Sequence, residues 1–407
     1  MPGTLPLGEP PPEDGSLPST VIAGATERDF GLYIHVPFCT VRCGYCDFNT
    51  YTQADMPGVA IGDFHRLAVA EINWAGNVLE RSGLPPRPVS TIFFGGGTPS
   101  LLTPDVFGDM LEAVEATWGI ADDAEVTIEA NPDSLDLDRL GDLVAAGVTR
   151  FSLGMQSARR EVLAVLDRTH DPARVPDVVS AIRHTSAQVS VDVIYGSPGE
   201  TVEMWQETLD QVVNLGVDHV SAYSLIVEPG TALARKISRG ELPGIDDDLH
   251  AQMYELADDV FAAGGLEWYE VSNWSTGSDT RSRHNLSYWT SEDWWGVGPG
   301  AHSHIGGVRW WNAKHPSAWA ERLTTNRNPA VGHEVLDSTT RQIEDVLLRI
   351  RTREGVAIAD CPPGRENAIA EFIARGFVDG RQALSGRLIL TRSGRLVADY
   401  VARELLA

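Results

Sequence analysis

The chain of 407 residues lacks three features that would each point to a particular class of protein. It has no apolar run near the ~20 residues needed to cross a bilayer, so we predict no integral membrane segment. It carries 32 Lys and Arg against 57 Asp and Glu, so we predict no basic surface for nucleic acid. Its four cysteines lack the paired spacing of a secreted disulfide framework, so we predict a cytoplasmic location.

The N-terminus also lacks the features of a targeting signal. The stretch "MPGTLPLGEPPPEDGSLPST" contains no Lys or Arg and no apolar core segment, which excludes a secretory or mitochondrial signal of the usual kind. Its proline, glycine and acidic residues instead predict a disordered tail over residues 1–28.

Strand and helix patterns alternate between residues 29 and 262. Alternation over this length is typical of βαβ units around a parallel sheet. Six units favour an open, partial (βα)6 barrel, so we predict an α/β core domain over 29–262. The predicted strands cover residues 32–36, 90–96, 125–131, 150–156, 189–196 and 219–227, and two of the helices between them cover 64–79 and 137–147.

Residues 263–407 have a different texture. An aromatic-rich stretch at 269–304 precedes segments that predict helices and a glycine-turned hairpin at 376–391. We predict a smaller α+β C-terminal region, with a fold similar to a winged helix at its end.

Three of the four cysteines lie together, directly after the first predicted strand. Cys39, Cys43 and Cys46 have the spacing C-x3-C-x2-C, with Gly44 between them, while Cys361 is remote. A structural zinc site usually needs four ligands arranged as two pairs, and no second pair exists here. Three thiolates on one loop instead suit three irons of a [4Fe–4S] cluster, leaving the fourth iron open to an outside ligand. A zinc site or a buried apolar cluster remain the alternatives.

The cysteine loop, with Tyr45 before its last cysteine, resembles that of the radical S-adenosylmethionine (SAM) superfamily. The resemblance implies that the amino and carboxylate groups of SAM bind the fourth iron, and that an electron from the cluster cleaves SAM to a radical.

Polar or glycine residues follow several of the predicted strands at the edge where a barrel gathers its functional residues. The second strand ends in "GGGTPS", where backbone free of side chains lets a ligand approach closely. Carboxylate or amide side chains end the next three strands, although each could equally cap a helix or bond a loop. The resemblance implies that SAM contacts Tyr33, Gly96, Gly97, Thr98, Glu129, Gln156, Arg168, Asp192 and Ser224.

Further motifs narrow the resemblance to the coproporphyrinogen III oxidase-like group. These are "YIHVPFC", "FFGGGTPSLL", "IEANPDSL", "RFSLGMQS", "DVIYGSPGET" and "GVGPGAHS", which together span most of the chain. The group implies either an oxygen-independent coproporphyrinogen III oxidase or a heme chaperone. The oxidase has a fourth cysteine where this chain has Phe48, and a longer N-terminal segment, so we favour the chaperone and predict no oxidase activity. A cluster with a purely structural role is a third possibility.

The motif H-N-x-x-Y-W is the candidate heme site. His284, Tyr288 and Trp289 carry it, and the resemblance implies heme bound there and passed to an acceptor protein that the sequence does not identify. Imidazole is a common axial ligand of heme iron. A core histidine within an aromatic cluster is the alternative. His302 and His304 are secondary candidates, and Cys361 is predicted to be incidental.

Overall fold

The computed structural model describes residues 8–52 and 59–406, and it is built around one curved sheet. The sheet has twelve strands in the order β14-β13-β12-β11-β1-β4-β5-β6-β7-β8-β10-β9. Its centre is a run of six parallel strands, which confirms the predicted partial (βα)6 barrel. These strands are β1 (Phe30–Val36), β4 (Val89–Gly96), β5 (Ile120–Ala130), β6 (Arg150–Gln156), β7 (Gln188–Tyr195) and β8 (His219–Ser224).

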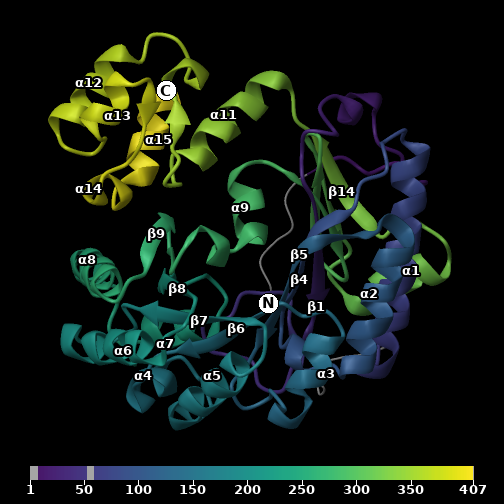
Figure 1. The fold of residues 1–407 in the computed structure, drawn as a ribbon, viewed down its shortest axis with the longest axis horizontal. Helices are drawn as coiled ribbons and strands as arrows, with labels where there is room; N and C mark the ends of the chain where they lie inside the picture. The colour runs from purple at the N-terminus through teal and green to yellow at the C-terminus, as the bar shows by residue number, and fades with distance from the viewer. Residues whose placement is uncertain (1–7, 53–58, 407) are drawn as a thin grey trace.

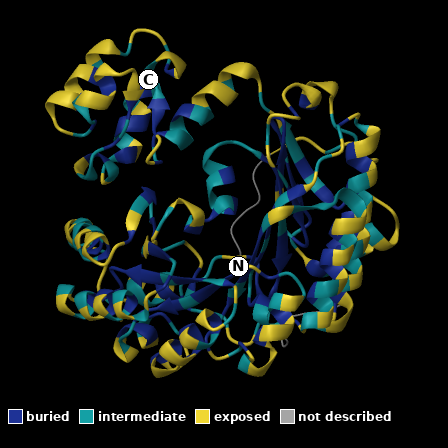
Figure 2. Cartoon of the chain, viewed as in Figure 1, coloured by how far each residue is buried: buried dark blue, intermediate teal, exposed yellow. Residues whose placement is uncertain are grey.

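Helices cover the convex side of this sheet, as Figure 1 shows. Each buries an apolar stripe against the strands and leaves its outer face exposed, which gives the alternation of dark and yellow ribbon in Figure 2. Most of these helices share one continuous hydrophobic core with the sheet, whereas the short helices over residues 160–165 and 232–238 contribute to a small separate cluster. The helices are α1 (Ile61–Arg81), α2 (Pro104–Trp118), α3 (Leu140–Ala145), α4 (Arg160–Val165), α5 (Val175–Arg183), α6 (Val202–Leu215), α7 (Ala232–Ser238) and α8 (Asp247–Ala263).

Further strands extend the six-stranded core on both sides. β11 (Asp293–Val297) pairs with β1 in parallel, and β12 (His302–Ile305), β13 (Val308–Asn312) and β14 (Ala330–Val335) continue antiparallel. On the other side β10 (Asn273–Ser275) and β9 (Glu267–Glu270) follow β8. Helix α10 (Pro316–Thr324) contacts α1, whereas α9 (Arg283–Trp289) lies on the concave side of the sheet (Figure 1). The expected boundary at 262/263 therefore does not coincide with a break in the sheet or in its core.

A second hydrophobic core belongs to the C-terminal part and begins only at Val346. It is formed by small helices and one short antiparallel strand pair. The elements are α11 (Ser338–Arg349), β15 (Val356–Ala357), α12 (Glu366–Ala374), α13 (Gly380–Leu384), β16 (Arg387–Leu388), α14 (Arg392–Arg395) and α15 (Ala398–Leu406). The hairpin predicted at 376–391 is wrong in its centre, because α13 occupies it and β16 pairs with β15. Only Val378 and Leu390 bridge across the predicted hairpin.

Residues 8–28 are packed against the folded chain rather than extended as the disordered tail that we predicted. We call them the N-terminal strap. The backbones of Glu9 and His333 exchange two hydrogen bonds of 2.9 Å, which adds a bridge to the outer side of β14. Val21 is fully buried, and Arg28 pairs with Asp293 at 2.9 Å. Residues 1–7 of the predicted tail lie outside the described residues.

Among the described residues, the helices are each too short or too polar to cross a lipid bilayer.

Candidate functional site

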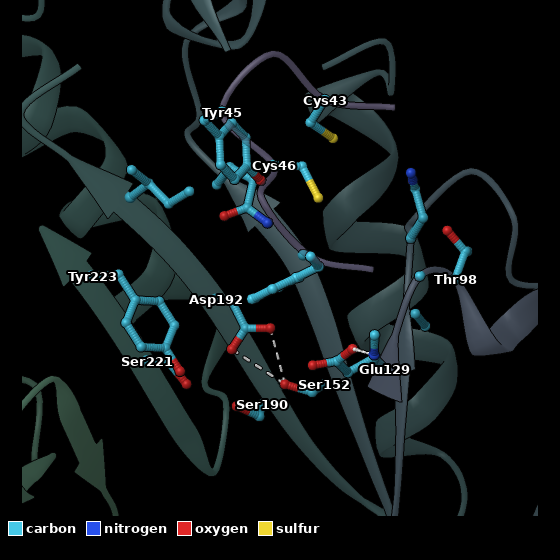
Figure 3. A pocket seen from close by; sticks show the side chains of 18 of the residues that line it. Cys43, Tyr45, Cys46, Thr98, Glu129, Ser152, Ser190, Asp192, Ser221 and Tyr223 are labelled. Carbon is cyan, nitrogen blue, oxygen red and sulfur yellow. Dashed lines mark hydrogen bonds between the residues drawn. The ribbon is translucent and has the colours of Figure 1, made fainter. Parts of the chain in front are cut away.

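The concave side of the six parallel strands encloses a cavity of about 570 Å³, within the usual range for small-molecule sites. Sixteen residues are the first candidates for the cluster, SAM and heme sites, and fifteen of them line the cavity, whereas Trp289 does not. Figure 3 shows Cys43, Tyr45 and Cys46 at one end of the cavity, Glu129, Ser152 and Asp192 at its middle, and Ser190 further in. The predicted strand ends therefore do converge on one space.

The cysteine loop is held by its neighbours on both sides. It runs between β2 (Phe38–Cys39) and β3 (Tyr51–Thr52). The Gly44 N–H donates to the carbonyl of Leu166 at 3.0 Å, and the Gly44 carbonyl accepts from Leu233 at 2.8 Å. A Cβ on Gly44 would lie 2.3 Å from Oδ2 of Asp167, so a side chain here would have to displace the Asp167 carboxylate.

The three thiols face the cavity with different surroundings. Burial raises the pKa of Cys39 to about 11 and also raises the pKa of Cys46. Arg168 donates to the Cys43 sulfur at 3.4 Å. No group of three or more His, Cys, Asp or Glu side chains within residues 8–52 and 59–406 is arranged for a single metal ion. A cubane makes a different demand, because each thiolate binds its own iron and the sulfurs need not share one point.

The glycine run at the end of β4 lies against the start of the cysteine loop. The N–H groups of Gly97 and Thr98 donate to the carbonyls of Val36 and Phe38 at 2.8 and 2.7 Å. A Cβ on Gly97 would lie 2.5 Å from the Phe38 carbonyl oxygen. Gly96 has a φ of 106°, which favours glycine, and its N–H donates to Glu129 at 2.9 Å. The run is thus a cradle of bare backbone between the cysteines and Glu129.

The end of β6 carries a strained residue. Gln156 has a φ of 60°, a left-handed conformation that is uncommon for residues with a side chain. The backbone of Gly154 leaves room for the side chains of Gln156 and Arg168, because a Cβ there would lie 2.9 Å from Nε2 of Gln156. Arg168 also donates to the Gly154 carbonyl at 2.8 Å. The hydrogen bond fixes the Arg168 guanidinium at the cavity wall, which Gln156 also lines.

Two carboxylates stand deep in the cavity. Burial, followed by the charge of Asp192, raises the pKa of Glu129 to about 7, while the Gly96 N–H acts against this rise. Burial raises the pKa of Asp192 to about 6, against the lowering effect of hydrogen bonds from Ser221 and Ser152 and the charge of Arg168. The Ser152 hydroxyl lies 3.2 and 3.0 Å from the two Asp192 oxygens. The pair offers negative charge that depends on pH near neutrality.

Several residues that line the cavity are not predicted from the sequence, because they lie inside strands rather than at strand ends. They share one signal: a polar side chain at every second position, which points to the same side of a strand as its neighbour two residues away. The residues are Thr127, Arg150, Ser152, Ser190, His219, Ser221 and Tyr223. Among them, His219 bonds Ser190 at 2.7 Å and Tyr269 at 2.7 Å, and so links β7, β8 and β9.

The H-N-x-x-Y-W motif forms α9 at the inner end of the cavity. His284 is 1% exposed, and its Nδ1 lies 2.8 Å from the hydroxyl of Thr91. Its Nε2 lies 2.7 Å from the hydroxyl of Tyr288, and its ring stacks on Phe93 at 5.2 Å. Burial lowers the pKa of His284 to about 3, so the ring is neutral. Trp289 does not line the cavity and lies beside Glu270.

The secondary candidates lie elsewhere. His302 stacks on Trp311 with a centroid distance of 5.9 Å, and His304 bonds the Glu292 carbonyl at 2.8 Å; neither lines the cavity. Cys361 is 7% exposed within the small C-terminal core.

The fold and the cavity together define a radical SAM protein, and the comparisons agree. The model of the Radical SAM superfamily matches residues 33–212. The heme chaperone HemW of Mycobacterium tuberculosis is 46% identical over 380 residues, which cover 93% of this chain and 95% of that protein. HemW of Bacillus subtilis is 32% identical over 329 residues, covering 80% and 84%. The chain therefore belongs to the HemW family of heme chaperones within the radical SAM superfamily.

The fold is also that of a solved oxidase. Escherichia coli coproporphyrinogen III oxidase, HemN, superposes with a TM-score of 0.78 over 95% of this chain and 92% of that chain. At 21% identity the likeness shows a shared fold.

Proposed function

We propose that this protein is a heme chaperone, which binds heme and transfers it to an acceptor protein. Membership of the HemW family carries the proposal, because the identity of 46% extends over nearly the full length of both chains. The position two residues after Cys46 supports it, since Phe48 stands where the oxidase has its fourth cysteine.

Cys39, Cys43 and Cys46 are proposed to bind three irons of a [4Fe–4S] cluster, with SAM at the fourth. The donor set supports this assignment, because three thiols open on one cavity beside the bare backbone of Gly96 and Gly97, which also line it. When bound, the cluster supplies an electron for the reductive cleavage of SAM. The backbone of Gly96 and Gly97 would receive the amino group of SAM, since this stretch has no side chains in the way.

The remaining cavity residues are proposed to hold the rest of SAM. A zwitterion with a ribose needs both charges and fixed acceptors, and the cavity offers Arg168 together with Glu129 and Asp192. Gln156 and Ser224 extend this polar wall, and the Ser224 hydroxyl is already positioned by His250 at 2.7 Å. Tyr33, Tyr45 and Thr98 complete the set.

Anaerobic reconstitution followed by an iron assay and a heme titration tests the proposal. We expect about four irons and about one heme per chain, and no vinyl product from coproporphyrinogen III with SAM and reductant. Cys43→Ala should lose the cluster, whereas Cys361→Ala, in the distant C-terminal core, should keep it. Sustained formation of protoporphyrinogen IX would reverse the choice in favour of the oxidase.

A further inference from the structure

Helix α9, which carries the H-N-x-x-Y-W motif, is not held in place by an apolar stripe. The described residues form three hydrophobic clusters, and none of the three contains a residue of α9. The helix has only seven residues, too few to be stable by itself, and it lies on the concave side of the sheet (Figure 1). His284 and Tyr288 line the cavity from this helix. The place of the motif therefore depends on particular polar and aromatic contacts.

The carboxylate of Glu125, on β5, binds the first turn of α9. Its Oε2 accepts from the Arg283 N–H and its Oε1 accepts from the His284 N–H, both at 3.0 Å. N–H groups in the first turn of a helix have no partner within the helix, and the helix dipole favours a negative charge beside them. Because one carboxylate bonds two adjacent N–H groups, it fixes the direction of the helix as well as its position.

The guanidinium of Arg150, on β6, binds both this carboxylate and the segment before α9. Its terminal nitrogens donate to the carbonyls of Thr280 and Arg281 at 3.0 Å each. Its Nη2 also lies 3.2 Å from Oε2 of Glu125. Arg150 is 2% exposed and Glu125 is 7% exposed, so water cannot readily replace either partner.

We infer that Glu125 and Arg150 are positioning residues that set the heme motif of α9 at the cavity, and we call them the anchor pair. The inference rests on the proposed function, with heme bound at the motif as the sequence predicts. Glu125 does not line the cavity, so it can act on a ligand there only through the residues that it holds.

The anchor pair stands on the two strands whose ends are proposed to contact SAM. Glu129 lies further along β5, and Gln156 ends β6. The two strands pair with each other in parallel. The heme motif and the SAM contacts are therefore placed relative to each other by one rigid pair of strands. A change at Glu125 should release the motif and leave the SAM contacts where they are.

Heme titration of the reconstituted full chain tests the inference through Glu125→Gln. One of the two helix N–H groups then faces an amide NH2 group, and Arg150 loses its counter-charge. Heme affinity should fall about tenfold or more, because hydrogen bonds to a charged group are lost at a buried site. The Soret band of the remaining bound heme should shift, since the backbone of His284 is no longer fixed. Iron content and SAM affinity should stay at their wild-type values.

Glu71→Gln is the matched control. Glu71 is a fully buried carboxylate that also accepts from a backbone N–H, that of Gly298 at 2.8 Å, but it makes no bond to α9 and does not line the cavity. Burial raises the pKa of Glu71 to about 7, so the variants are compared at pH 8, where this carboxylate is ionised. The control should keep its heme affinity and the position of the Soret band. An equal loss of heme in both variants would overturn the inference, because general destabilisation would then explain it.

Arg150→Lys is the conservative variant. It keeps a positive charge beside Glu125 but cannot reach both carbonyls of Thr280 and Arg281. Its heme affinity should lie between those of the wild type and Glu125→Gln, and an affinity below that of Glu125→Gln would contradict the shared role of the pair.

Hydrogen exchange of the heme-free wild-type chain provides a measurement that needs no substitution. The amides of Arg283 and His284 should be protected although they lie in the first turn of a helix. In Glu125→Gln the segment 280–289 should exchange about tenfold faster or more, while the central strands keep their protection. Free exchange of the two amides in the wild type, or full heme affinity in Glu125→Gln, would overturn the inference while the chaperone proposal stands. A wild-type chain that takes up no heme would overturn both.

Discussion

Gly97 illustrates how tightly single positions are specified in this cavity. Its N–H bonds the backbone at Val36, and the space where a side chain would begin is occupied by backbone oxygens of Val36 and Phe38 at 2.8 and 2.5 Å. Backbone atoms cannot rotate away as a flexible side chain can. Any side chain here must push the glycine run and the cysteine loop apart.

Gly97→Ala should therefore lower the free energy of unfolding by about 1–3 kcal/mol and reduce both iron retention and SAM affinity. Gly108→Ala is the control, because Gly108 lies inside α2 with no atom within 4 Å of its would-be Cβ. That change should stabilise the protein by about 0.5–1 kcal/mol. Chemical denaturation gives the free energy of unfolding of the two variants, and iron analysis gives their iron content. Full iron retention in Gly97→Ala would contradict the close packing of Gly97 against the backbone of Val36 and Phe38.

The carboxylates of Glu129 and Asp192 predict how SAM affinity depends on pH. Their raised pKa values, about 7 and about 6, mean that both become neutral as the pH falls below about 6. The positively charged SAM, in its proposed position, then loses two nearby negative charges. SAM affinity should rise several-fold, up to about tenfold, between pH 5.5 and pH 8.

Isothermal titration across this pH range provides the measurement. Glu129→Gln should weaken binding at pH 8 and flatten the profile, because the amide carries no charge at any of these pH values. A profile that stays as steep in the variant would assign the pH dependence to another group.

At the scale of secondary structure, the sequence predicted the six central strands to within a few residues at most ends. Their apolar runs are buried on both faces by helices and by the barrel interior, which gives a strong and local signal. The strand-end residues followed from the rule that parallel strands present their carboxyl ends together. Inward-facing serines such as Ser152 and Ser190 were missed, since one polar residue within an apolar run is a weak signal.

Elements that depend on distant partners could not be read from the sequence. The sequence predicts a separate region for β11 to β14, because β11 joins the sheet by pairing with β1 across more than 200 residues of chain and the other three strands follow β11. β16 pairs with β15 rather than with its sequence neighbour, and α13 takes the place of the predicted turn. One of the two hydrogen bonds to the His284 ring likewise involves Thr91, on a strand far away in sequence.

The small C-terminal core docks on α8 through Arg395. Its guanidinium pairs with Asp258 at 2.6 Å, lies 4.4 Å from the centroid of the Trp268 ring and is only 8% exposed. Arg395→Ala should lower stability by about 1–3 kcal/mol, because the largely buried Asp258 loses its nearest ion pair and keeps only the Trp274 N–H at 3.0 Å and Arg392 at 3.9 Å. Arg403→Ala, which removes an exposed pair at 3.7 Å, should change stability by less than about 1 kcal/mol. Thermal unfolding and limited proteolysis near α11 distinguish the two variants.

At the scale of the whole molecule, the N-terminal strap stabilises the sheet on the side away from the cavity. Its residue Val21 is fully buried against the β12–β13 turn, whereas the adjacent Ile22 is 41% exposed. Val21→Ala should lower the free energy of unfolding by about 1–2 kcal/mol and Ile22→Ala by distinctly less. Heme titration and iron content should be unaffected in both. A change in heme affinity would give the strap a functional role that its position does not suggest.

Both ends of the twelve-stranded sheet are covered within this one chain. The bridge between Glu9 and His333 occupies the β14 side, and Glu270 of β9 bridges to Thr352, with further backbone bonds from Val271 and Arg353. Unpaired strand edges attract strands from other proteins. A heme carrier of the proposed kind would meet acceptors repeatedly and then separate, and strand edges that are already bridged within its own chain favour that separation. Its encounters are left to side-chain surfaces, where contacts form and dissolve without templated backbone pairing.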